Sequence, residues 1–173
     1  MHSVAGDTTA TNPQRFRHVL GHLPTGLAVV TALHDGEPVG MVVNSLTSVS
    51  LDPPLVLFCP ALTSTTWPRI EAASGFCVNV MAADAQDVCA RLAGRRTNRF
   101  EGVTHDLTAG GHPVLEGTLA WLDCRLWRQY PGGDHIIAVG RVDALDHRPG
   151  EPLVFFRSTY RRLSRPNDRH IDG

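Results

Sequence analysis

The chain has 173 residues, a mass of 18.8 kDa and a formal net charge of -1. This length predicts one domain, and the nearly balanced charge argues against a protein that binds nucleic acid through bulk electrostatics. No apolar stretch reaches the roughly 20 residues of a membrane-spanning helix. All 16 basic residues are arginines, so chemistry that requires a lysine, such as Schiff-base formation, is excluded.

The cysteines and histidines do not form a recognisable metal-binding pattern. The four cysteines are Cys59, Cys77, Cys89 and Cys124, and none of them forms a C-x-x-C pair. The nine histidines likewise show no spacing typical of metal ligands, so no metal site is predicted. The N-terminal residues lack the apolar core of a signal peptide, which predicts a reduced, cytoplasmic protein.

The elements expected in chain order are mostly strands. Residues 1–12 are small and polar and predict a disordered tail. Pro13 begins a helical pattern that Pro24 ends, with one apolar face formed by Phe16, Val19, Leu20 and Leu23. Strands are expected at 26–32, 39–49, 55–59, 75–81, 118–130, 135–145 and 153–156.

Only short helices interrupt these strands. They are expected at 65–73 and 84–92, residues 95–111 predict a long loop, and 164–173 predict a charged tail. The Asp35-Gly36 pair indicates a tight hairpin turn. The pattern therefore predicts one mainly β domain at 13–163, an antiparallel barrel of about six strands with a few short helices.

Three polar features stand out, because the common nucleotide, zinc and hydrolase motifs are absent. The first is the run Asn44-Ser45-Leu46-Thr47-Ser48-Val49-Ser50 inside an apolar strand pattern. Alternation leaves neither face of this run purely apolar, as expected of a strand lining a wet groove for a polar ligand. The competing interpretation is a strand end that enters a Ser/Thr-rich turn.

The other two features are a hydroxyl cluster and a glycine turn. The hydroxyl cluster Thr63-Ser64-Thr65-Thr66 precedes a short helix, where free N–H groups and hydroxyls can bind phosphate; simple helix capping is the alternative. In Gly132-Gly133-Asp134-His135 the glycines allow close backbone approach and the histidine can contact a ligand. The alternative is a surface turn with an incidental histidine.

Taken in order along the chain, these features resemble the short-chain flavin reductases. The resemblance is carried by Pro24-Thr25-Gly26-Leu27-Ala28-Val29-Val30-Thr31, by the segment from Gly40 to Leu55, and by Gly133-Asp134-His135. It runs from about Phe16 to about Leu163, and Arg99-Phe100-Glu101-Gly102 and Tyr160-Arg161-Arg162-Leu163 also look like family segments. It implies the FMN-binding split-barrel fold, here six antiparallel strands, and a homodimer with flavin near the interface.

The resemblance also implies a function and a set of site residues. The family oxidises NADH or NADPH and passes reduced FMN or FAD to a separate flavin-dependent monooxygenase. Thr25 would lie near the flavin ring, with Asn44, Ser45, Leu46 and Thr47 on the ring and ribityl chain and Ser50, Pro53 and Pro54 shaping the groove. Ser64 and Thr65 would hold phosphate, Phe100 and His135 would border the nicotinamide, and Tyr160 or Arg161 would close the far end. We treat His135 as the catalytic candidate in a positioning and electrostatic role.

Two departures from the family pattern keep alternatives open. Many members carry Thr where this chain has Val42 and Phe where it has Leu46. Loss of an aromatic contact at Leu46, worth about 0.5–1.5 kcal/mol, leaves the choice between FMN and FAD open. The alternatives are a split-barrel flavoprotein that uses bound flavin for other chemistry on a small metabolite, and a non-catalytic module that binds flavin or haem.

Overall fold

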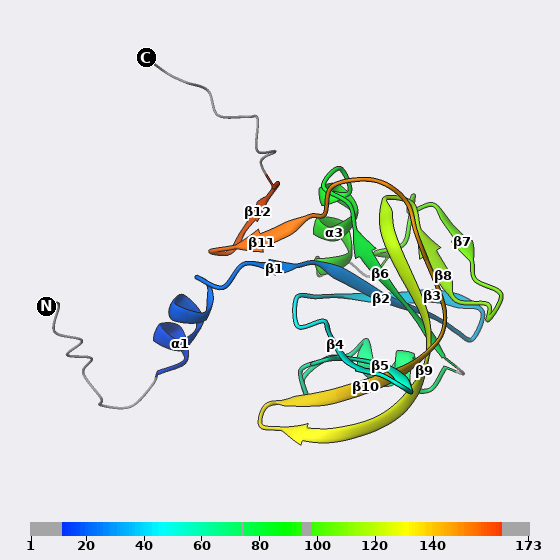
Figure 1. Ribbon diagram of the computed structural model, residues 1–173, viewed down its shortest axis with the longest axis horizontal. Coiled ribbons are helices and arrows are strands. Elements are labelled where there is room, and N and C mark those ends of the chain that lie inside the picture. The colour runs from blue at the N-terminus through cyan, green and yellow to red at the C-terminus, as the bar shows by residue number, and fades with distance from the viewer. Residues whose placement is uncertain (1–11, 74, 95–97, 164–173) are drawn as a thin grey trace, which may run out of the picture.

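The structure is a computed structural model, and it describes residues 12–73, 75–94 and 98–163. Its helices are α1 (Pro13–Leu20), α2 (Trp67–Glu71) and α3 (Gln86–Ala93). Its strands are β1 (Thr25–Gly26), β2 (Ala28–His34), β3 (Glu37–Val43), β4 (Thr47–Leu51), β5 (Pro54–Phe58), β6 (Phe76–Met81), β7 (His105–Leu107), β8 (Pro113–Leu115), β9 (Thr118–Gly132), β10 (His135–His147), β11 (Val154–Phe156) and β12 (Thr159–Arg161) (Figure 1). The predicted tails at 1–12 and 164–173 lie outside the described residues except for Asn12, which caps α1.

One antiparallel sheet dominates the fold. Its strand order is β3-β2-β6-β9-β10-β5-β4, and the long β9–β10 hairpin runs through its middle. The prediction of a mainly β protein is confirmed. The sheet nevertheless has seven strands instead of six, and no backbone ladder joins its edge strands β3 and β4, so hydrogen bonding does not close it into a barrel.

A small sheet, β1-β11-β12, extends from the main sheet towards α1 (Figure 1). Its β11–β12 hairpin turns at Arg157 and Ser158, whose φ angles are 50° and 60°. Left-handed conformations at both central positions define a turn that favours Asn-Gly, so each of these side chains costs about 1–2 kcal/mol there. The two-residue turn at Gly133 and Asp134 uses a glycine, with φ 76°, for the same conformational need.

Two apolar clusters form the core. The first packs Phe58, Trp67 and Phe76 edge to face inside the main sheet, with ring centroids 5.4–5.6 Å apart. The second packs α3 through Cys89 and Leu92 against residues of β2, β6 and β8. A buried polar network joins these layers, because the Asn79 amide donates to Val29 O and accepts from Leu115 N at 3.1 and 2.9 Å.

Two expected elements are wrong in their bounds. The expected strand at 39–49 is two strands, because the chain leaves β3 after Val43, bends through 44–46 and enters β4 at the opposite edge of the sheet. A register shift between Ser48 and Ser50 breaks the predicted alternation again. The loop expected at 95–111 contains β7, which pairs with β8; residues 95–97 lie outside the described part.

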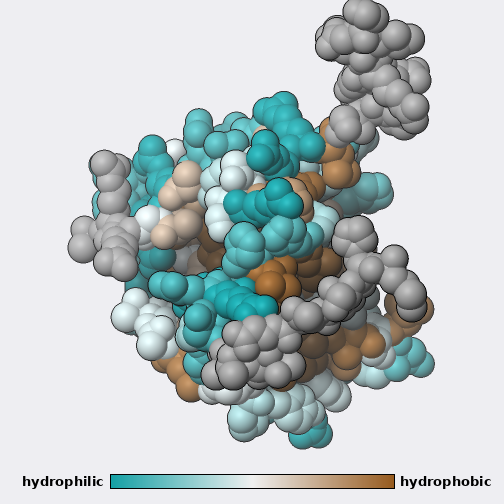
Figure 2. Space-filling model, turned by 90° about the vertical axis from the view of Figure 1, so that its left-hand side faces the viewer, coloured by the Kyte–Doolittle hydropathy of each residue, from teal (hydrophilic) through white to brown (hydrophobic). Residues whose placement is uncertain are grey.

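Helix α1 has no buried residue. It begins at Pro13 as expected and ends at Leu20 rather than near Pro24. Three residues of the predicted apolar face lie on the helix and are exposed, with exposed fractions of 54 % for Phe16, 56 % for Val19 and 49 % for Leu20. Leu23, 63 % exposed, lies beyond the end of the helix. Figure 2, which views the molecule from this side, shows apolar surface between polar groups. No described helix has the length and hydrophobicity needed to cross a bilayer.

Candidate functional site

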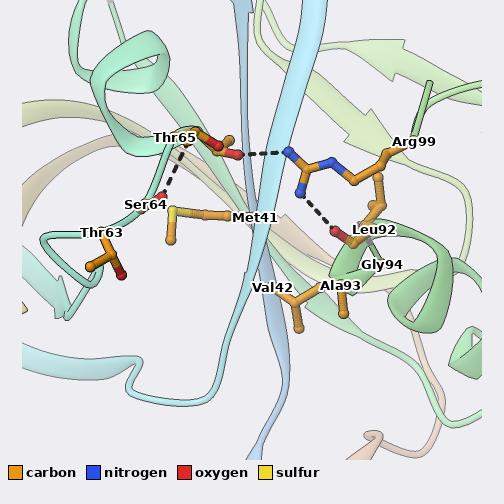
Figure 3. A pocket seen from close by; sticks show the side chains of 10 residues that line it. Met41, Val42, Thr63, Ser64, Thr65, Leu92, Ala93, Gly94 and Arg99 are labelled. Atoms are coloured by element: carbon orange, nitrogen blue, oxygen red, sulfur yellow. Dashed lines mark hydrogen bonds between the residues drawn. The ribbon is translucent and has the colours of Figure 1, made fainter. Parts of the chain in front are cut away.

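A pocket of about 630 Å³ lies between β3, the segment before α2, and the end of α3 (Figure 3). It is lined by Met41, Val42, Thr63, Ser64, Thr65, Thr66, Leu92, Ala93, Gly94 and Arg99. Its volume falls within the roughly 300–1,000 Å³ of small-molecule sites. The pocket thus brings the predicted phosphate residues Ser64 and Thr65 together with apolar side chains of β3.

The way Ser64 holds the start of α2 differs from the expectation. The hydroxyl of Ser64 accepts hydrogen bonds from the backbone N–H groups of Thr66 and Trp67 at 3.3 and 3.0 Å. Those N–H groups are therefore already paired, and the residue after Trp67 is Pro68, which has no N–H. Phosphate binding here has to come from hydroxyl groups rather than from a free helix terminus.

Arg99 supplies the positive charge of this pocket. Its guanidinium donates to Thr66 Oγ1 at 2.7 Å and to the carbonyl oxygen of Leu92 at 3.1 Å, which fixes it opposite Ser64 and Thr65 (Figure 3). A guanidinium has five N–H donors, so three remain for a ligand. The sequence places Arg99 among the arginines at 91–99 that could bind the additional phosphate of NADPH, but predicts no contact between Arg99 and flavin.

The polar run lies beside the end of β5. The Cys59 backbone N–H donates to the Ser45 hydroxyl at 2.9 Å, which ties the bend at 44–46 to the chain that leads to Ser64. Leu46 packs against the first core cluster, whereas Asn44 and Thr47 are exposed. The polar run is therefore a bend that exposes polar groups at the edge of the sheet, instead of a continuous strand.

The glycine turn reaches the same side of the molecule. Backbone bonds of 2.9 Å join Leu62 N to Asp134 O and Ile136 N to Pro60 O, so the β9–β10 turn lies against the loop before Ser64. The His135 ring bonds the Asp134 carboxylate at 2.7 Å. That hydrogen bond first, then the charges of His135 and Arg17, lower the pKa of Asp134 below its ordinary value.

Thr25, Phe100 and Tyr160 lie near the second core cluster. The Thr25 hydroxyl oxygen is buried and has no hydrogen-bond partner among the described residues. Thr25 pairs with Phe155, whose ring lies 5.9 Å from that of Tyr160. Burial, and then the charge of Cys89, raise the pKa of Tyr160. Phe100 packs over β3, where a Cβ on Gly40 would lie 3.0 Å from its ring.

The remaining predicted residues are not gathered at this pocket. Pro53 and Pro54 form the turn at the far end of the β4–β5 hairpin, about 14 Å of strand from Thr47. Ser50 lies close to that turn, opposite Leu55. Arg161 is exposed on β12.

A buried His–Asp pair was missed by sequence reasoning. His112 Nδ1 lies 2.5 Å from Asp123 Oδ1, both residues are almost fully buried, and His112 Nε2 has no partner among the described residues. A Cβ on Gly75 would lie 2.6 Å from this ring. Asp123 lies in the strand expected at 118–130, where it alternates with apolar residues, and this alternation gives no sign of a buried partner.

The arrangement fits a phosphorylated, partly apolar ligand. Hydroxyls and a fixed guanidinium line one wall of the pocket, and Met41 and Val42 line another. Hydroxyl and guanidinium donors bind phosphate, and the apolar side chains suit a planar ring. The residues present therefore fit a flavin mononucleotide unit without requiring a metal.

Comparison with known proteins gives one consistent result. Residues 20–164 match the flavin reductase like domain family. The chain is 44 % identical over 165 residues to the flavin-dependent monooxygenase reductase subunit HsaB of Rhodococcus jostii, covering 92 % of this chain and 85 % of the relative.

Solved structures agree with this match. Nitrilotriacetate monooxygenase component B of Mycobacterium thermoresistibile has a TM-score of 0.85 at 40 % identity, covering 87 % of this chain and 86 % of that one. The NADH:FAD oxidoreductase SgcE6 of Streptomyces globisporus, solved with NAD and FAD fragments, has a TM-score of 0.84 at 35 % identity over 92 % and 99 % of the two chains. The chain belongs to the flavin reductase like domain family.

Proposed function

We propose that the protein is an NAD(P)H:flavin oxidoreductase that reduces FMN or FAD with NADH or NADPH and supplies the reduced flavin to a partner flavin-dependent monooxygenase. The pocket that joins Ser64, Thr65 and Arg99 carries this proposal, because it offers a phosphate site inside a flavin reductase fold. The similarity to a monooxygenase reductase subunit supports the partner.

The protein's task in this reaction is to bind and orient. When bound, flavin and nicotinamide supply the hydride chemistry themselves. Ser64, Thr65 and Arg99 hold the flavin phosphate, while Asn44, Ser45, Leu46 and Thr47 border the ring and ribityl chain. Thr25 lies near the ring, Phe100 borders the nicotinamide together with His135, and Tyr160 closes the far end of the site. Ser50, Pro53, Pro54 and Arg161 lie farther away and shape the surroundings.

His135 positions the nicotinamide in this scheme. Its ring is bonded to Asp134 and its side chain is 44 % exposed, so it can contact a ligand that reaches the β9–β10 turn. Hydride transfer needs no general acid, and the gain from a correct approach geometry is large. The Asp134 carboxylate holds the orientation of the ring.

A steady-state assay with purified protein tests the function. NADH or NADPH is mixed with FMN, FAD or riboflavin, and loss of the nicotinamide absorption band is followed at several protein concentrations. We expect a rate proportional to protein for at least one flavin. A rate equal to the protein-free background, with flavin retained through gel filtration, would favour bound flavin used for other chemistry. A Soret band on reconstitution would indicate a haem module.

We also propose that the protein is a homodimer. Three apolar side chains on one face of α1, those of Phe16, Val19 and Leu20, are each about half exposed, which is unusual for a monomer surface and typical of an interface. Leu20→Asp is expected to halve the mass measured by analytical ultracentrifugation, whereas Gln14→Asp, on the opposite face of α1, leaves it unchanged. A monomeric wild-type protein would refute the dimer.

The cysteines support a cytoplasmic location as a further part of this proposal. All four are free, and three of them are buried. Free thiols are typical of proteins in reducing compartments.

A further inference from the structure

A second pocket, of about 470 Å³, lies between the end of α1 and the β11–β12 turn. It is lined by Arg17, His18, Gly21, His22, Arg157 and Ser158. Two arginines and two histidines thus surround it, and no carboxylate of the described residues lines it. None of its residues is shared with the pocket at Ser64 and Arg99.

The positive charge of this pocket is not neutralised from within. Among the described residues neither Arg17 nor Arg157 forms an ion pair. The carbonyl groups at the end of α1 already have partners, because Gly21 N donates to Arg17 O at 2.8 Å and Arg157 N donates to Gly21 O at 2.9 Å. The described lining therefore offers guanidinium donors and no carboxylate, which is the chemistry that phosphate needs. The carboxylate on which the charge of Arg17 acts, that of Asp134, lies outside this lining.

The backbone holds Arg157 in place at a conformational cost. Both Arg157 and Ser158 adopt left-handed φ angles, 50° and 60°, in a turn that Asn-Gly would form without strain. The Arg157 guanidinium lies over the Phe156 ring, 5.2 Å from its centroid, at an exposed position. Strained positions that gain no core packing are typical of binding sites.

The pocket lies beside Tyr160, proposed to close the far end of the site, and on the side of His135, proposed to border the nicotinamide. Tyr160 follows Ser158 by two residues on β12, and the charge of Arg17 acts on Asp134, which is bonded to His135. Residues of a helix advance by about 100° each, so Arg17 lies about 60° from Leu20, at the flank of the apolar face, whereas His18 lies about 160° from Leu20. A dimer formed through the apolar face would thus have this pocket at its edge.

We propose that this second pocket binds the phosphates of the pyridine nucleotide, the pyrophosphate of NADH and also the additional phosphate of NADPH. This rests on the proposed function, in which both substrates carry phosphate. The fold has one cationic pocket beside the flavin residues and another on the side of His135, proposed to border the nicotinamide. FAD also carries a pyrophosphate, so the test has to separate the two nucleotides.

Single substitutions of the arginines, with a matched control, make that separation. Arg17→Gln and Arg157→Gln are each expected to raise KM for NADH about tenfold while changing kcat far less, as expected for loss of one charged hydrogen bond. The dissociation constants of FMN and FAD, measured by flavin fluorescence, should stay within twofold. Arg128→Gln removes one exposed charge from β9 and should change neither. An unchanged KM, or a weakened FAD affinity with an unchanged KM, would overturn the proposal.

In the β11–β12 turn, the melting temperature and KM for NADH measured together distinguish a ligand-binding role of Arg157 from a structural one. Arg157→Gly relieves the left-handed strain, so the melting temperature should rise or stay constant while KM for NADH increases about tenfold. A lower melting temperature together with an unchanged KM would show that Arg157 serves folding instead.

Binding of ADP-ribose tests the second pocket independently of the proposed reductase activity. ADP-ribose carries the pyrophosphate but neither nicotinamide nor flavin, so calorimetry measures its binding without any reaction. We expect the wild-type protein to bind it and Arg157→Gln to bind it about tenfold more weakly. Absence of ADP-ribose binding would refute this pocket even if NADH is oxidised. Binding without NADH oxidation would refute the reductase function and leave the pocket intact.

Discussion

Replacing Arg99 by methionine removes the charge of the flavin pocket while keeping the length of the side chain. Two hydrogen bonds are lost, at 2.7 Å to Thr66 Oγ1 and at 3.1 Å to Leu92 O, so the free energy of unfolding should fall by about 1–3 kcal/mol. Loss of a charged hydrogen bond to the flavin phosphate should cost a further 1.5–3 kcal/mol of binding, roughly a 10- to 150-fold weaker affinity for FMN.

Riboflavin provides the internal control, because it has the same ring and ribityl chain but no phosphate. Fluorescence titration should show Arg99→Met weakening FMN binding strongly and riboflavin binding by less than twofold. Arg128→Met, an exposed change of the same charge, should affect neither ligand. An equal loss of affinity for FMN and riboflavin would show that Arg99 supports the pocket wall and does not contact phosphate.

Three further outcomes are expected. Gly75→Ala places a Cβ 2.6 Å from the His112 ring and should lower the free energy of unfolding by about 1–3 kcal/mol. Gly26→Ala serves as the control, because its Cβ meets no atom within 4 Å and should change the free energy of unfolding little. Equal denaturation midpoints for the two variants would contradict this expectation. His135→Ala should lower kcat/KM for NADH about tenfold, or about 1.4 kcal/mol, with flavin affinity kept, and Thr47→Ala should do the reverse; unchanged nicotinamide kinetics would remove the role of His135. Burial raises the thiol pKa from 9.0 to about 12 for Cys77 and about 11 for Cys89 and also raises that of Cys124, so only Cys59 should react rapidly with a disulfide reagent at pH 8. The buried thiols ionise at lower pH in the unfolded chain than in the folded one, so the free energy of unfolding should fall as the pH rises above 9. Rapid reaction of two or more thiols with the disulfide reagent would contradict the burial of these cysteines.

Local patterns predicted most strands of the fold. The Asp35-Gly36 turn forms between β2 and β3, and the β9–β10 hairpin turns at Gly133, because both signals act over a few residues. The break after Val43 was missed, since a run of small and β-branched residues reads as one strand whether or not the chain changes partners. Which strand pairs with which is a long-range property that periodicity does not contain.

The burial of particular polar side chains was also hidden from the sequence. Asp123 alternates with apolar neighbours as an exposed residue would, but it is buried because His112 reaches it from a turn eleven residues earlier. The apolar face of α1 shows the opposite case, where a correct pattern faces solvent within one chain. Amphipathic spacing shows that a face is to be covered, without showing by what.

The candidate site residues were inferred mainly from the order of their motifs. Ser64 and Thr65 share a pocket. Backbone bonds join Asp134 and Ile136, which flank His135, to the loop at 60–62, and the Ser45 hydroxyl accepts a hydrogen bond from Cys59 N just before that loop. No flavin contact was predicted for Arg99 and no ligand role for Arg157, because a lone arginine in a chain with 16 of them carries no signal until its neighbours in space are known.

Hydride transfer itself is tested most directly by anaerobic rapid mixing of the protein and FMN with NADH. We expect the flavin band to bleach in step with the loss of the nicotinamide band, at a rate that saturates with NADH. If both bands are lost no faster than in protein-free solution, although the protein concentration is high enough to bind FMN, the assignment as a flavin reductase is contradicted.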